Sequence, residues 1–308
     1  MYLVGLSRSV NPIRAVLLPL QIKPIIMKRL ELRLPLLIGA TILAGVLQAQ
    51  QLPMPSPYAE VEQTIGLAEI EIEYSRPSMK GRTIFGDLVP YGEIWRTGAN
   101  KCVQLEVSDQ IMVNGNMLDS GKYSLFTIPG EKEWTIIINT NTELWGAGGY
   151  SQEQDVMRFN VPSSGMAEAA ESFTIDFSNI TPNTADCNIY WERTRVSFPI
   201  EHDYREKAMA NIKEALSKED APFGAWESAA EFYIDHDLDK KKALEMAKKS
   251  VELKEVFWNV YTLSRAFDYN GMRDEALQAA RRSLELAEEA QYKTYIDLNK
   301  KNIEAWSK

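Results

Sequence analysis

Hydrophobic and polar residues alternate along the first half of the chain with the two-residue period of half-buried strands. Glutamates alternate with apolar residues over 69–74, and a similar alternation returns over 103–107. Because successive side chains of a strand point to opposite faces, this pattern places one face in a core and the other in solvent. It predicts an antiparallel sheet with one buried face and one solvent-exposed face.

Turn signals divide the same region into short strands. Asn114-Gly115, Ser120-Gly121 and Pro129-Gly130 are dipeptides typical of tight turns. Further strands are expected between and after them, at 110–113, 122–128, 133–139, 156–161, 173–180, 187–192 and 195–200. So many short strands with frequent turns favour an antiparallel β-sandwich or jelly-roll-like domain, which we place at 61–201.

From residue 202 the apolar positions change to the period of a helix. The segments 226–254 and 258–287 each predict a helix pair, and their second helices repeat corresponding positions at an interval of 33 residues. This spacing, with small alanines on the helices, resembles tetratricopeptide helix pairs. We therefore expect a fold that is mainly β plus α, with an α-helical-repeat domain (tetratricopeptide-like) at 202–308.

The first 49 residues read as a targeting region. Basic residues at 28, 29 and 33 precede a fourteen-residue apolar run at 34–47, and Ala49 is a small residue suited to a cleavage site. This is the order of regions in a secretory signal peptide, and Met27 suits its start, with residues 1–26 lying upstream. We expect export to the periplasm or the outside, with an uncleaved anchor as the alternative. Residues 50–60 are proline-rich and predict a linker.

Charge and residue counts narrow the function further. The chain has a net charge of −9, and removal of 1–49 leaves 28 basic and 42 acidic residues, a net charge of −14. Such a balance argues against a nucleic-acid binder. Two histidines in the whole chain exclude a histidine-rich metal site, and no phosphate-binding glycine motif occurs, so we predict neither a metal nor a cofactor. Cys102 and Cys187 could form a disulfide, although buried free thiols are favoured.

One connecting stretch, 74–100, differs from the rest of the acidic domain. It holds four glycines, two prolines and four of the ten basic residues found in 50–200, but only two acidic residues, Asp87 and Glu93. We expect a long ordered loop with one helical turn near 83–88, and long ordered loops are often functional. A glycine-aromatic stretch at 145–150 could face it. The residues that we predict to bind a ligand are Arg76, Lys80, Arg82, Tyr91, Trp95, Arg96 and Asn100.

Two explanations of this positive cluster remain open. Arginine holds carboxylates and phosphates through two parallel hydrogen bonds, and an aromatic face can cover a sugar ring, so the cluster suits a small anionic or sugar-like ligand. Alternatively, the arginines pair with the neighbouring glutamate-rich strand and only brace the loop.

The stretches EYSRP, KGRTIFGDLVPYG, WRTGAN and YSLFTIPG resemble a family of exported bacterial proteins known as domain of unknown function 2911. The resemblance covers about residues 56–200. It implies a β-rich domain, often followed by a helical tail, and brings no activity and no catalytic residues.

The most direct functional hypothesis is a non-catalytic binding protein of the cell envelope. The loop would bind the small ligand, and the helical repeats would hold a protein partner, since repeat helices commonly present binding surfaces. The alternative is a hydrolase or lyase acting on carbohydrate through Asp87 or Glu93 together with Arg96. Whether the protein is an enzyme stays open, and we assign no catalytic residue.

Overall fold

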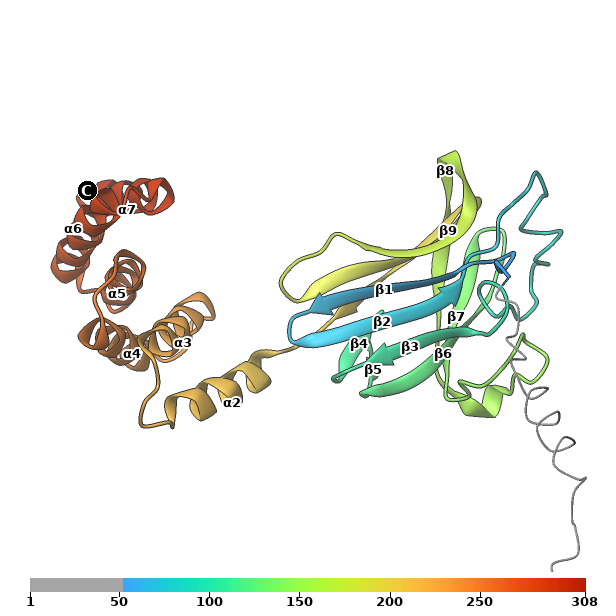
Figure 1. Ribbon diagram of the computed structural model, residues 1–308, viewed down its shortest axis with the longest axis horizontal. Helices are drawn as coiled ribbons and strands as arrows, with labels where there is room; N and C mark the ends of the chain where they lie inside the picture. Colours follow the sequence, from blue (N-terminus) through green and yellow to red (C-terminus); the bar gives the residue numbers. More distant parts are fainter. Residues whose placement is uncertain (1–51) are drawn as a thin grey trace, which may run out of the picture. The chain divides into compact units, whose positions relative to one another are not determined.

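The computed structural model describes residues 52–308, and within them a β-rich region is followed by helices (Figure 1). The predicted signal peptide at 1–49 and the first two residues of the predicted linker lie outside this range. The strands are β1 (Tyr58–Ile65), β2 (Ala68–Ser75), β3 (Val103–Val107), β4 (Ile111–Val113), β5 (Asn116–Leu118), β6 (Gly121–Ile128), β7 (Glu133–Asn139), β8 (Asp155–Ser178) and β9 (Thr184–Glu201).

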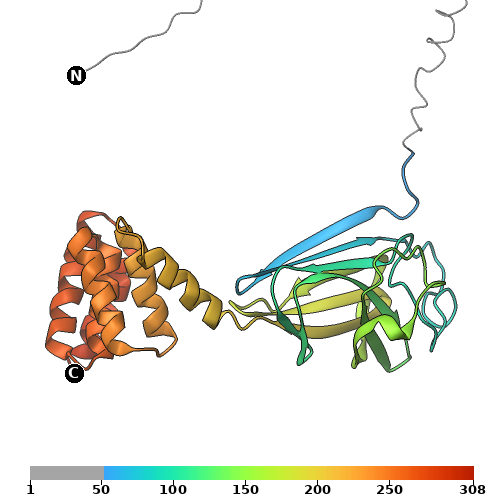
Figure 2. The same cartoon turned by 90° about the horizontal axis from the view of Figure 1, so that it is seen from below.

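All nine strands form one antiparallel sheet in the order β1-β2-β3-β6-β7-β8-β9-β4-β5. The early part of β8 pairs with β7, and its later part pairs with β9 across two register shifts. Because these long strands bend, the sheet folds over on itself and brings β1 close to β8 and β9 (Figures 1 and 2). The expected mainly β architecture followed by helices is confirmed.

The core lies between the two halves of the folded sheet. The alternation predicted for β2 is observed, with Ile70, Ile72 and Tyr74 buried. Facing them are large aromatic side chains from later strands, among them Trp134, Trp191 and the ring of Phe173. Burial of these apolar surfaces is the dominant force that holds such a sandwich together.

The structure departs from the predicted strands in two places. The strands expected separately at 156–161 and 173–180 are parts of β8, and those expected at 187–192 and 195–200 are parts of β9. The intervening residues remain extended because they continue the β8–β9 pairing. The sequence also left β1 unassigned. β1 is an edge strand of the sheet. Its side chains alternate between exposed and half-buried positions, so its sequence shows little of the apolar–polar alternation that predicts a strand.

The long connection between β2 and β3 contains no helical turn, so the turn expected near 83–88 is wrong. The amide of Val89 donates to the carbonyl oxygen of Ile84 (2.8 Å), and that of Gly86 donates to the carbonyl oxygen of Val89 (2.9 Å). Gly86 has φ +87°, which a right-handed helix does not allow. These residues form a tight closed loop instead.

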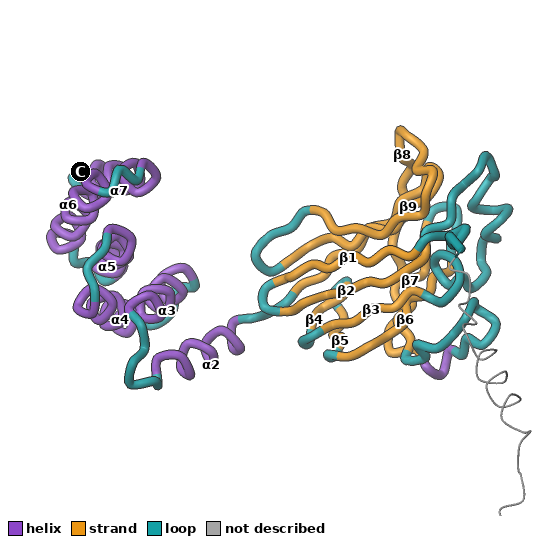
Figure 3. Tube along the Cα trace, viewed as in Figure 1, coloured by secondary structure: helices purple, strands orange, loops and turns teal. Residues whose placement is uncertain are grey.

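Six α-helices follow the sheet, preceded by the short 3-10 helix η1 (Gln152–Gln154) within the strand region (Figure 3). They are α2 (Arg205–Leu216), α3 (Phe223–Asp235), α4 (Lys240–Leu253), α5 (Phe257–Tyr269), α6 (Arg273–Glu289) and α7 (Lys293–Trp306). Helix α3 packs on α4 and α5 on α6, and small alanines at their contacts allow close approach. Within residues 52–308, no helix combines the length and apolar composition needed to cross a membrane.

A hydrogen-bond motif recurs in these helices. The Ser250 hydroxyl donates to the carbonyl oxygen of Phe223 (2.8 Å) and accepts from the Asn259 side-chain amide (2.9 Å). One helix pair later, the hydroxyl of Ser283 donates to the carbonyl oxygen of Phe257 (2.7 Å) and accepts from the amide of Asn299 (2.8 Å). The two serines are the positions that the sequence places 33 residues apart.

Both cysteines are buried free thiols, as the sequence favoured. Cys102 lies in a small apolar cluster with Phe126 and Ile137, whereas Cys187 belongs to the main core. Burial raises the pKa of both thiols, so they stay protonated and poorly reactive at neutral pH.

Candidate functional site

The β2–β3 loop is held to the sheet at its start, middle and end. At its start, the Phe173 amide donates to the carbonyl oxygen of Pro77 (2.9 Å). In its middle, the amide of Ile84 donates to the Glu192 carboxylate (3.2 Å). At its end, Trp95 exchanges two backbone hydrogen bonds with Thr127 (2.7 and 2.9 Å). A connection without regular structure is thereby held in a fixed conformation.

Three non-glycine residues of this loop have positive φ angles: Lys80 at +50°, Thr97 at +60° and Asn100 at +61°. A β-branched residue such as threonine rarely adopts this conformation. Thr97 is fully buried, and its hydroxyl donates to that of Thr127 (3.1 Å), which compensates part of the cost. Such strained residues gather at functional sites, where the surrounding structure holds them in place.

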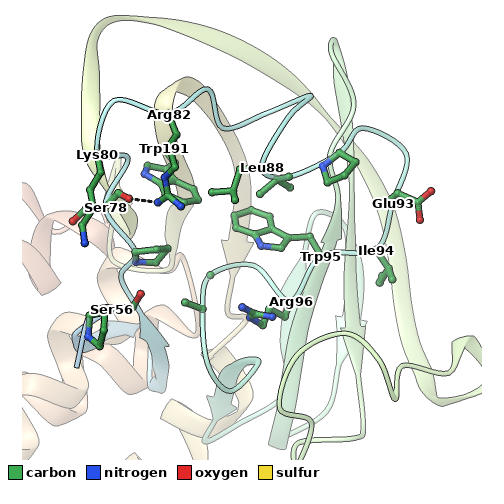
Figure 4. A pocket seen from close by; sticks show the side chains of 16 residues that line it. Ser56, Ser78, Lys80, Arg82, Leu88, Glu93, Ile94, Trp95, Arg96 and Trp191 are labelled. Carbon is green, nitrogen blue, oxygen red and sulfur yellow. Dashed lines mark hydrogen bonds between the residues drawn. The ribbon is translucent and has the colours of Figure 1, made fainter. Parts of the chain in front are cut away.

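A pocket of about 440 Å³ opens beside the loop (Figure 4). This volume lies within the range typical of small-molecule sites. Basic, hydroxyl and apolar side chains share its wall. The lining residues are Pro55, Ser56, Pro77, Ser78, Lys80, Arg82, Leu88, Val89, Pro90, Glu93, Ile94, Trp95, Arg96, Gly98, Ala99 and Trp191.

Arg96 is the unusual residue of the pocket. Its side chain is half-buried, and its Nε–H is shielded from solvent and has no hydrogen-bond acceptor among residues 52–308. Gly146 lies beside it, since a Cβ on this glycine would be in ordinary van der Waals contact with Arg96 Nη1 (3.5 Å). Leaving a buried donor unsatisfied costs about 1–3 kcal/mol, and more when the group is charged. The arginine is therefore placed where an added acceptor would be strongly favoured.

Lys80 and Arg82 contribute to the same pocket. The guanidinium of Arg82 donates to the backbone carbonyl oxygens of Ser78 (2.7 Å) and Met79 (2.9 Å), which shapes the loop around it. In Figure 4 the side chains of Arg82 and Arg96 extend toward the space beside the ring of Trp95. Within residues 52–308, none of these three cations forms a salt bridge with a carboxylate. The pocket keeps its positive charge.

The other predicted site residues do not line the pocket. Arg76 donates from Nε to the carbonyl oxygen of Phe173 (3.0 Å) and from Nη2 to the Thr174 hydroxyl (2.7 Å). The side-chain amide of Asn100 donates to the hydroxyl of Ser75 (3.1 Å) and to the backbone carbonyl oxygen of Ser56, which lines the pocket. Tyr91 is exposed and packs against Gly86. Arg76 and Asn100 therefore stabilise the loop around the pocket through hydrogen bonds and do not line the pocket themselves.

Trp95 belongs at once to the pocket wall and to the core. Its ring stacks on that of Trp191, with centroids 6.3 Å apart and an interplanar angle of 15°. It also makes edge contacts with Phe85, Trp134 and Phe173. Sequence reasoning missed Trp191, because it lies on a strand far along the chain and only pairing of β8 with β9 brings it under the loop.

The glutamate-rich strand is not the partner of the arginines. Across β1 and β2, Glu60 lies opposite Glu73 and Glu62 lies opposite Glu71. Glu71 is also opposite Glu106 on β3. These carboxylates form an acidic outer face, and the desolvation of Glu71 together with its acidic neighbours raises the pKa of that side chain.

The two carboxylates considered for catalysis are not brought together around the pocket. Asp87 is exposed and does not line it. Glu93 does line it, but in Figure 4 its carboxylate extends away from the ring of Trp95. Within the described part of the chain, no group of three or more His, Cys, Asp or Glu side chains is placed to hold a metal ion.

Comparison with known proteins gives a family for the β region. Residues 56–200 match the family model described as "Protein of unknown function (DUF2911)". No curated protein and no solved structure matches the chain. The β region that carries the pocket is therefore a DUF2911 domain and belongs to that family.

Proposed function

We propose that this protein is an exported, non-catalytic binding protein of the cell envelope, whose pocket holds a small anionic or sugar-like ligand. The observation that carries the proposal is Arg96, a half-buried cation in a pocket with no carboxylate partner in the described chain and with a shielded, unsatisfied Nε–H. A carboxylate or phosphate would accept hydrogen bonds from this guanidinium. The half-buried indole of Trp95 supplies apolar surface for the rest of the ligand, and the buried ring of Trp191 stacks on it.

The test compares two arginines of the same loop. Wild type and the Arg96→Ala, Arg96→Lys and Arg76→Ala variants are titrated calorimetrically with glucuronate, galacturonate, N-acetylneuraminate, succinate and inorganic phosphate. We expect Arg96→Ala to abolish binding of whichever acid the wild type binds, Arg96→Lys to weaken it, and Arg76→Ala to retain it in the folded protein. Absence of binding by wild type to every acid would refute the proposal.

The alternative of a hydrolase or lyase has less support. General acid–base chemistry needs two groups positioned around the reacting bond. Of the two candidate carboxylates, only Glu93 lines the pocket. The mixture of cations, hydroxyls and indoles fits recognition of an acidic ligand better than cleavage of one.

For the helical region we propose a protein-binding role through tetratricopeptide-like repeats. Support comes from the recurrence of the serine–asparagine motif and from the contacts of α5 with both α3 and α7, which align alternate helices as repeat arrays do. Affinity capture by the helical region from a periplasmic extract, with and without an excess of the β domain, would show whether these helices carry a partner.

A further inference from the structure

A second loop, residues 141–154, lies against the pocket. The carbonyl oxygen of Leu144 accepts from the Cys102 amide (3.0 Å), and the Leu144 side chain joins the apolar cluster that also includes Ile94 of the pocket wall. The next contact is made by Gly146, which is buried, has φ +103° and lies beside the Arg96 guanidinium. Leu144 and Gly146 thus hold this loop along the segment 94–96.

Trp145 lies between these two contacts, but its side chain is not packed. It is 73% exposed, which equals the highest value among the large exposed hydrophobic residues of 52–308. Gly146, Gly148 and Gly149 carry no side chains that could cover the indole. Trp145 does not line the pocket, but it directly precedes Gly146, which lies beside the Arg96 guanidinium. Exposed aromatic side chains close to a binding pocket commonly act as anchors that supply much of the binding energy.

We propose that the pocket and Trp145 form one extended site for an acidic oligosaccharide, an inference that rests on the proposed function. The carboxylate of one sugar ring would accept hydrogen bonds from Arg96, and that ring would lie against the indole of Trp95. The apolar face of the neighbouring ring would cover the indole of Trp145. Lys80 and Arg82 provide further positive charge for a chain with one carboxylate on each ring.

Charge distribution favours this ligand over a general attraction to anions. The chain as a whole is acidic, with a net charge of −9, so an anionic polymer is repelled by most of the molecule and attracted to a locally basic site such as this pocket. An isolated phosphate or a short acid would satisfy Arg96 but would leave Trp145 uncovered. The exposed indole therefore indicates a ligand that is longer than the pocket.

The experiment titrates galacturonic acid and its trimer into wild type and the Trp145→Ala, Trp145→Phe and Tyr91→Ala variants. Tyr91→Ala is the matched control, because Tyr91 is also an exposed aromatic residue but packs against Gly86, whereas Trp145 directly precedes the glycine beside Arg96. We expect the trimer to bind wild type about five- to tenfold more tightly than the monomer. Trp145→Ala should remove this advantage and leave monomer affinity unchanged, Trp145→Phe should restore part of it, and Tyr91→Ala should have no effect.

The outcomes separate the two proposals. Equal affinity of wild type for monomer and trimer, or an unchanged trimer affinity in Trp145→Ala, would overturn the extended site and leave the proposed function standing. A parallel loss of monomer and trimer binding in Trp145→Ala, accompanied by a lower melting temperature, would show that Trp145 supports the fold and would also overturn it. If wild type binds neither these sugars nor any small acid, both proposals fail together.

Discussion

The arginines of the β2–β3 loop show how far residue-level prediction reaches. Clustering of basic residues in 74–100 indicated the region of the pocket, and Lys80, Arg82, Trp95 and Arg96 do line it. The direction of each side chain could not be predicted, because a loop has no periodicity that assigns residues to faces. Arg76 and Arg96 carry the same charge twenty positions apart. Arg76 has backbone and hydroxyl acceptors, whereas the buried Nε–H of Arg96 has no acceptor in the described part of the chain.

This difference predicts opposite effects on stability. Arg76→Ala should lower the free energy of unfolding by about 1–3 kcal/mol, since it leaves the carbonyl oxygen of Phe173 and the hydroxyl of Thr174 without their donor. Arg96→Ala should not lower it and should raise it by up to about 1–3 kcal/mol, because the substitution removes an unsatisfied buried donor and breaks no hydrogen bond within residues 52–308. Chemical denaturation followed by circular dichroism measures both. A loss of stability in Arg96→Ala would show that this arginine serves the fold.

At the scale of elements, the alternation of glutamates with apolar residues correctly predicted β2 and its wet face. It could not predict which strands lie beside it, because pairing is set by contacts distant in the sequence. The resulting register places Glu62 and Glu106 on either side of Glu71. Like charges directly opposite on neighbouring strands are destabilising. The acidic outer face therefore weakens the sheet at neutral pH.

The raised pKa of Glu71 determines how this destabilisation changes with pH. The folded state holds the proton more tightly than the unfolded state, so stability decreases as pH rises from the unfolded pKa through the folded one. Glu71→Gln should stabilise the protein at pH 7 by about 0.2–1 kcal/mol, and the gain should disappear near pH 3. Glu69→Gln is the control, because Glu69 lies opposite Thr64. Melting curves at both pH values test this, and a gain that persists in acid would contradict it.

At the scale of the whole molecule, the change of periodicity at 201–203 correctly predicted where strands end and helices begin. Between β9 and α2, His202 is buried and accepts a hydrogen bond from the Leu67 amide through Nδ1 (2.9 Å), whereas Asp203 is exposed. The sequence could not predict the first of these features, because Leu67 lies in the β1–β2 turn, far from residue 202 along the chain.

We predict that the strand and helical regions behave as separate units. Limited proteolysis should yield a β fragment ending at roughly residues 200–205, since domain boundaries fall where few contacts cross. Mass spectrometry of the fragments identifies the cut. Resistance of this segment, combined with a single melting transition for the whole chain, would instead indicate one cooperative unit.

Export is predicted to leave a mature chain that begins near Gln50. The basic residues followed by the apolar run at 34–47 are the pattern that signal peptidase substrates share. N-terminal mass spectrometry of the protein purified from its native host tests this. An intact 1–49 segment in a cytosolic fraction would exclude export, whereas the same segment in a membrane fraction would indicate a retained anchor.

The aromatic cluster behind the pocket has an optical consequence. The indole of Trp95 lies 6.1 Å from that of Trp134 and 6.3 Å from that of Trp191, distances at which excited states couple and exchange energy. The three rings should therefore give an exciton couplet in the far-ultraviolet circular dichroism and should exchange excitation energy in fluorescence. Because Trp95 lines the pocket and lies close to the other two rings, an occupant would perturb the emission of the whole group. The protein thus contains its own fluorescent reporter of pocket occupancy.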